Sequence, residues 1–73
     1  MATLEKEFGR IMRRSRKASG ITQETLAEIV NISCVYCRQI EHGEHRATWI
    51  TWLRICSVLQ IDISEIQKLL TAE

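Results

Sequence analysis

The amino-acid sequence predicts an all-α fold, in which five short helices form a single domain over residues 1 to 73. Proline is absent and only 5% of the residues are aromatic. Alanine, isoleucine, leucine, glutamate, lysine and arginine dominate instead, which favours helices joined by short turns over a sheet. Apolar residues also recur three and four positions apart, the spacing of one helix face, and polar capping residues precede several of these runs.

The first helix is expected over about residues 3 to 18, because Leu4, Phe8, Ile11 and Met12 recur at helical spacing and Gly20 supplies a stop. The other faces of this helix carry mainly the basic residues Lys6, Arg10, Arg13, Arg14 and Lys17. Residues 1 to 20 contain six Lys or Arg and two Glu, whereas the rest of the chain has a surplus of three acidic residues. The formal net charge of +1 therefore conceals a basic N-terminal end.

Two short helices are expected next. Thr22 caps the first of them, and Leu26, Ala27 and Val30 form its inward stripe. Asn31 ends this helix, because asparagine tolerates the left-handed backbone that a sharp turn requires. The following helix begins after Ser33, stops at Gly43 and directs Cys37 and Ile40 into the core.

The C-terminal third of the chain predicts two more helices and no linker. Thr48 caps a helix that carries Trp49, Trp52, Leu53, Cys56 and Leu59. The last helix is expected from Ile63 to Leu70. Both tryptophans are interpreted as core residues.

The segment TQETLAEIVNISCVYCRQIEHG, residues 22 to 43, has the spacing of a helix-turn-helix. It resembles the lambda-repressor-like (Cro or XRE-type) DNA-binding domains, and the resemblance continues through TWITWLRICSVLQIDISEI. The positions that match the family pattern are Arg16, Gly20, Thr22, Gln23, Leu26, Ala27, Ser33, Ile40, Glu41 and Gly43. Asn31 in place of the usual turn glycine and Trp49 in place of a common leucine are departures. The resemblance implies a five-helix lambda-repressor-like fold.

The resemblance also implies how such a domain meets double-stranded DNA. The third helix enters the major groove, which is about 12 Å wide, and the second helix rests its N-terminus on the phosphate backbone. The residues expected to contact bases are Cys34, Val35, Arg38 and Gln39. Arg38 suits guanine and Gln39 suits adenine. The alternative for Arg38 is a phosphate or a neighbouring glutamate.

A second group of residues is expected to position the protein on the DNA backbone without reading sequence. It comprises Thr22, Gln23, Tyr36, His42 and Arg46. The role of Gln23 follows from the family, in which the matching glutamine touches phosphate. The family pattern further implies a largely buried ion pair between Arg16 and Glu41, which ties the first helix to the end of the third.

The same part of the sequence also contains a candidate metal site. Cys34, Cys37, His42 and His45 have the spacing CxxC-x4-H-x2-H, and four such ligands suffice for tetrahedral zinc. Cys37 is already needed in the core, however, and a turn separates the histidines from the cysteines. No metal or cofactor is therefore expected. No catalytic set occurs in a pocket context, so neither an enzyme nor a small-molecule substrate is expected.

We interpret the chain as a homodimeric transcriptional regulator that occupies a DNA operator and blocks or touches RNA polymerase. Ile50 and Ile63 are the expected dimer contacts, because Ile50 stands where the family is usually polar. Three cysteines, no signal segment and no long apolar run predict a cytoplasmic protein without a membrane partner. The rival hypothesis is an antitoxin-like or partner-binding module that has kept the helix-turn-helix and lost most DNA binding.

Overall fold

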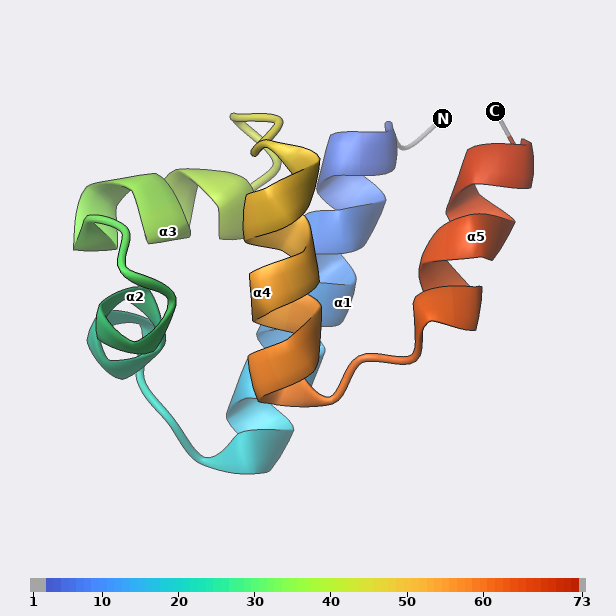
Figure 1. Ribbon diagram of the computed structural model, residues 1–73. Coiled ribbons are helices and arrows are strands. Elements are labelled where there is room, and N and C mark those ends of the chain that lie inside the picture. The colour runs from blue at the N-terminus through green and yellow to red at the C-terminus, as the bar shows by residue number, and fades with distance from the viewer. Residues whose placement is uncertain (1–2, 73) are drawn as a thin grey trace.

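The computed structural model describes residues 3–72 and contains five helices and no strand within that range. In chain order they are α1 (Leu4–Ser19), α2 (Gln23–Val30), α3 (Cys34–Glu41), α4 (Trp49–Leu59) and α5 (Ile63–Ala72). The expected all-α, five-helix class is confirmed, and the expected ends lie within two residues of the observed ones. In Figure 1, α2 and α3 lie on one side of the paired α1 and α4, and α5 lies on the other. None of the helices in residues 3–72 is long and apolar enough to cross a lipid bilayer.

The helices α1 to α4 begin at hydroxyl caps, as the sequence predicts for three of them. The side chains of Thr22, Ser33 and Thr48 each accept a hydrogen bond from the backbone N–H three residues later, at 3.1, 3.0 and 3.3 Å. Thr3 caps α1 in the same way at 3.2 Å. Each cap satisfies one of the amides that the first helical turn leaves without a partner, and such a cap stabilises a helix by about 1 kcal/mol.

The turns between helices use left-handed residues. Asn31, which was expected to make the turn after α2, has φ 61° and ψ 49°, and its N–H reaches the carbonyls of Ala27 and Glu28. After α3, His42 stays right-handed and Gly43 takes φ 74°. Gln60 ends α4 at φ 56°, a conformation that sequence analysis does not anticipate for glutamine.

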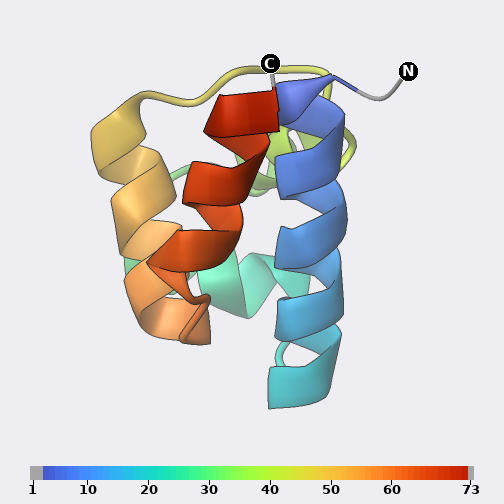
Figure 2. The ribbon, with the colours of Figure 1, turned by 90° about the vertical axis from the view of Figure 1, so that its right-hand side faces the viewer.

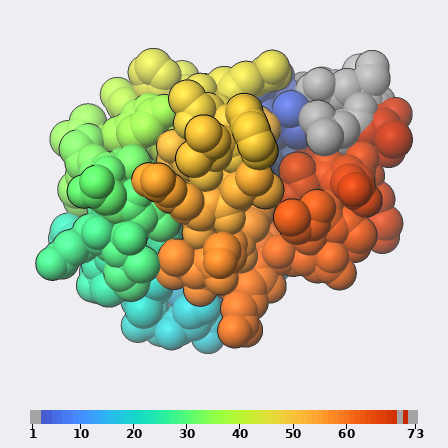
Figure 3. Space-filling view, viewed as in Figure 1, coloured from blue at the N-terminus to red at the C-terminus, as the bar shows by residue number. Residues whose placement is uncertain are grey.

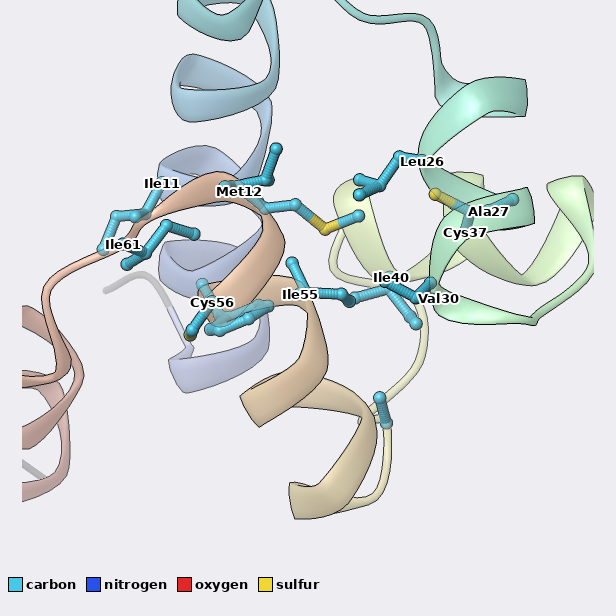
Figure 4. Close-up of a cluster of buried hydrophobic side chains, with 13 residues drawn as sticks. Ile11, Met12, Leu26, Ala27, Val30, Cys37, Ile40, Ile55, Cys56 and Ile61 are labelled. Atoms are coloured by element: carbon cyan, nitrogen blue, oxygen red, sulfur yellow. The ribbon is translucent and has the colours of Figure 1, made fainter.

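One apolar cluster joins the first four helices and the segment that leads into α5 (Figure 4). It contains the inward residues expected of α2 and α3 and those expected of α1 except Leu4, which is buried outside the cluster. Its members are Phe8, Ile11, Met12, Leu26, Ala27, Val30, Cys37, Ile40, Ala47, Ile55, Cys56, Leu59 and Ile61. The ring of Trp52 stacks on that of Phe8 with their centroids 4.7 Å apart. Trp52 is therefore part of the packing, as predicted.

The prediction that Trp49 belongs to the core is wrong. Its relative exposure is 68%, and that of Leu53, one turn later in the same helix, is 41%. The first turn of α4 diverges from α1 and α5 (Figure 2), so neither of these helices covers this part of α4. In Figure 3 the side chains of α4 lie uncovered at the front of the molecule.

Gly9 marks the closest approach between α1 and the end of α3. A Cβ atom at this position would collide with the carbonyl group of Glu41 and lie 2.9 Å from the carbonyl oxygen of Ile40. A glycine inside a helix normally weakens the helix. We attribute Gly9 to the lack of room for a side chain between α1 and the end of α3.

We therefore predict that Gly9→Ala destabilises the protein although alanine is the better helix former. Overpacking of this kind costs about 1–3 kcal/mol, which outweighs a gain in helix propensity of roughly 1 kcal/mol. Thermal denaturation followed by circular dichroism measures the effect. Ser19→Ala, at an exposed position of the same helix, is the control and should leave Tm nearly unchanged. A Tm for Gly9→Ala equal to or above that of the unmodified chain would contradict the close approach.

Candidate nucleic-acid interface

The geometry of the candidate site begins with the pair α2 and α3. Three residues separate these helices, and the N–H of Ile32 bonds to the carbonyl of Ala27 at 2.9 Å, which closes the turn around Asn31. Figure 1 shows α2 nearly end-on beneath α3, so the two helices cross at a steep angle. This is the arrangement of a helix-turn-helix, in which the second helix projects its outer side away from the first.

The outer face of α3 carries the side chains that were expected to contact bases. Cys34, Val35 and Arg38 are exposed, and Gln39 is half-buried. Within residues 3–72, no side-chain hydrogen bond or ion pair engages Arg38 or Gln39. Cys37 on the opposite face is fully buried. A surface of mixed polar and apolar groups on one short helix is thus open to a ligand.

Glu41 is the last residue of α3, and within residues 3–72 it is the charged residue that is buried. Arg16 of α1 holds it with two parallel bonds: Nε donates to Oε2 at 2.9 Å and Nη2 donates to Oε1 at 3.0 Å. The side chain of Glu41 is 1% exposed and that of Arg16 is 12% exposed. The hydrogen bond to Glu41 is also the main reason that the pKa of Arg16 is raised. This geometry is a bidentate, charge-assisted pair.

Two further contacts extend this pair to α2. Nη1 of Arg16 donates to the carbonyl oxygen of Ile21 at 2.9 Å, and Nε2 of Gln23 donates to Oε1 of Glu41 at 3.2 Å. Glu41 thereby orients Gln23 at the N-terminus of α2. The amide of a glutamine has two N–H groups, so this contact leaves one of them for another acceptor.

The other residues expected at the DNA backbone have intramolecular partners. The hydroxyl of Thr22 caps α2 and donates to Thr25 Oγ1 at 3.0 Å, so its one O–H is in use. Arg46 pairs with Glu5 of α1. Nδ1 of His42 lies 3.6 Å from a carboxylate oxygen of Glu44.

Tyr36 and Cys37 are less accessible than the other residues in the first turn of α3. Tyr36 is half-buried, and its ring meets that of His45 edge-on with centroids 5.9 Å apart.

Burial raises the pKa of the Cys37 thiol to about 11, and metal ligation requires the thiolate. No group of three or more His, Cys, Asp or Glu side chains in the described part of the chain is placed to hold a metal ion.

Known proteins share this architecture. A family model described as a helix-turn-helix domain matches residues 7–69, and the chain belongs to this helix-turn-helix family. The restriction-modification controller protein C.AhdI from Aeromonas hydrophila is 30% identical in sequence, with a TM-score of 0.75 over 84% of this chain and 88% of the controller. The resemblance to lambda-repressor-like domains is thereby confirmed.

Two crystal structures of the clp gene regulator ClgR from Corynebacterium glutamicum share the fold at lower sequence identity. Their TM-scores are 0.82 and 0.84 at 23% and 21% identity. The matches cover 89% and 97% of this chain and 83% and 76% of the regulator. No curated protein sequence matches the chain.

The buried ion pair leads to a stability prediction. Glu41→Ala strands the Arg16 guanidinium in a mostly buried position and removes the partner of Gln23, so the free energy of unfolding should fall by about 3–5 kcal/mol. Glu44→Ala removes an exposed carboxylate and should change it by less than about 0.5 kcal/mol. Urea denaturation of both variants makes the comparison. Equal losses would mean that the pair does not anchor α3.

Proposed function

We propose that this chain is a sequence-specific DNA-binding transcriptional regulator that occupies an operator as a homodimer. In this proposal α3 lies in the major groove and reads base edges with Cys34, Val35, Arg38 and Gln39. The described residues pack around one core, which suits a single domain that acts through its surface. No cofactor and no catalytic step are part of the proposal.

The observation that carries the proposal is the uncovered outer face of α3 beside a tightly anchored turn. Arg38 has the bidentate donors that guanine O6 and N7 accept, and Gln39 has the donor and acceptor pair that adenine N6 and N7 require. Val35 is 54% exposed, and its methyl groups suit the methyl group of thymine. The likeness to two regulators, ClgR and the controller C.AhdI, supports the same function.

Backbone contacts would come from the N-terminus of α2 and from the turn after α3. Free amides at a helix N-terminus favour a phosphate, and Gln23 already stands there, oriented by Glu41. To bind a phosphate, Thr22 would have to give up its hydrogen bond to Thr25. Arg46 would have to leave Glu5 or contact Glu5 and a phosphate at the same time. Tyr36 and His42 would lie at the edges of this contact.

The apolar part of the surface supports the homodimer. Trp49, Ile50 and Leu53 of α4 and Ile63 at the start of α5 are 68, 51, 41 and 49% exposed. Trp49, Ile50 and Leu53 lie three and four residues apart on one helix, and exposed apolar side chains grouped in this way are typical of an interface with another chain. A symmetric pair would present two copies of α3 to half-sites about 34 Å apart.

The free cysteines fit the location that goes with this function. Cys34, Cys37 and Cys56 carry no disulfide, as is usual in a reducing cytoplasm. A regulator bound to its operator would act there by blocking RNA polymerase from the promoter, or by touching it when bound nearby.

Selection of binding sites from random duplex DNA, followed by affinity measurements at several salt concentrations, tests the function. We expect palindromic sites and a clearly negative slope of log affinity against log salt, because cations that neutralise phosphates release counterions. A slope near zero with no selected sequence would overturn the proposal. That outcome would favour the partner-binding alternative, in which the exposed apolar face of α4 would be the surface that binds the partner.

Substitutions on α3 separate base reading from backbone contact. Arg38→Ala and Gln39→Ala should each cost roughly 1–3 kcal/mol of binding free energy at the selected site and relax the preference at one base pair. Competition binding with single-base-pair variants of the site measures both effects. Arg54→Ala, which removes an exposed cation from α4, is the control. An equal loss on every sequence would reassign Arg38 to a phosphate.

The dimer contact has a matched pair of variants. Ile50→Glu places a charge in the proposed interface and should weaken dimerisation by about 2 kcal/mol or more. Ile29→Glu, at an apolar α2 residue of similar exposure (56% against 51%), should leave the dimer intact. Sedimentation equilibrium of each variant gives the dissociation constants. Unchanged association of Ile50→Glu would exclude this face as the contact.

A further inference from the structure

A stripe of four cations runs along the outer side of α1. Lys6, Arg10, Arg13 and Lys17 follow one another at intervals of four, three and four residues, which places them on one helix face. All four are exposed. The stripe lies about 200° around the helix from the buried residues Leu4, Phe8 and Ile11, and it is roughly 16 Å long. We call it the α1 basic stripe.

The charge of the α1 basic stripe is largely uncompensated within the described residues. Arg10 pairs with Glu7 at 2.9 Å, and its side chain remains 61% exposed. Lys6, Arg13 and Lys17 take part in no ion pair in residues 3–72. Arg14, one position off the stripe, is different because it is bonded to Glu65 of α5. Like charges three and four residues apart repel one another on a helix, so an anion along this face would relieve the repulsion.

The two ends of the α1 basic stripe adjoin the two segments that the proposed function places on the DNA backbone. At one end, Lys6 packs directly on the turn after α3, since a Cβ on Gly43 would lie 2.8 Å from the Cα of Lys6. At the other end, Lys17 bonds through its carbonyl to the N–H of Gly20, where the chain turns toward α2. Figure 2 shows α1 at the edge of the bundle, with α4 and α5 on one side of it.

We propose that the α1 basic stripe is a second DNA-binding surface, which holds phosphates flanking the half-site that α3 reads. This inference rests on the proposed function. The occupant is duplex DNA rather than an acidic protein, because the two ends of the stripe adjoin the turn after α3 and the turn that leads into α2, where the proposed function expects phosphate contacts. The contact carries no base information, so it raises affinity for all sequences and lengthens the stretch of duplex that the protein covers.

The test uses the full chain, the selected operator, and two duplexes. One duplex ends at the outer edges of the half-sites, and the other extends ten base pairs further on each side. The stripe variant is Arg13→Gln with Lys17→Gln. The control variant, Arg54→Gln with Lys68→Gln, removes the same charge from exposed positions of α4 and α5. Binding is measured by fluorescence anisotropy at several salt concentrations, and circular dichroism checks that each variant keeps its helices.

On the extended duplex, the stripe variant should bind with a log–log salt slope shallower by about three to four, since the dimer loses four phosphate contacts and each removes roughly 0.9. Its affinity at 0.1 M salt should fall on the order of a thousand-fold. On the short duplex it should bind like the unmodified chain, and the control variant should keep the full slope on both duplexes.

Each of the other outcomes overturns the inference. If the stripe variant and the control variant have equal slopes on the extended duplex, the stripe does not touch DNA, while the proposed function stands. If the stripe variant loses slope equally on both duplexes, the flanking placement is wrong. If the unmodified chain shows no salt-dependent binding to either duplex, the proposed function fails and the inference fails with it.

Discussion

The carboxylate of Glu41 is buried, and the placement of the helix-turn-helix depends on how its charge is neutralised. Arg16 supplies two of its hydrogen bonds and Gln23 a third, so α1, α2 and the end of α3 share one polar centre. A buried carboxylate without such partners would be very costly. The same hydrogen bonds that hold α3 at a fixed angle also orient the side-chain amide of Gln23 at the start of α2. The hydrogen bonds to Glu41 therefore both stabilise the fold and position Gln23 for the proposed contact with the DNA backbone.

Local signals explain why most of the fold could be predicted from the sequence. Hydroxyl caps such as Thr22 and Ser33, and the left-handed turn at Asn31, act within four residues of chain. The inward stripe Leu26, Ala27 and Val30 is likewise a property of one helix. The identity of the outward face of α3 follows from the same periodicity, once Cys37 is assigned to the core.

The features that escaped prediction depend on distances between elements. Trp49 has the spacing of a core residue, yet it is exposed because α4 leans away from its neighbours at that end. Arg46 was expected to be free for phosphate, whereas it meets Glu5, which is 41 residues earlier in the chain. Gly9 did carry a signal, since glycine is unfavourable inside a helix and its presence there suggests a packing constraint, although the pattern does not say which element imposes it.

The different surroundings of the two tryptophans give the molecule a pair of built-in optical reporters. Trp52 stacks on Phe8, and its indole nitrogen is buried and makes no hydrogen bond among the described residues. Trp49 stands in solvent on the face of α4. Emission from Trp52 is therefore sensitive to loss of the core, and emission from Trp49 to whatever comes to cover that face. A single chain without any dye thus distinguishes unfolding from association, and replacing either ring with phenylalanine assigns each signal.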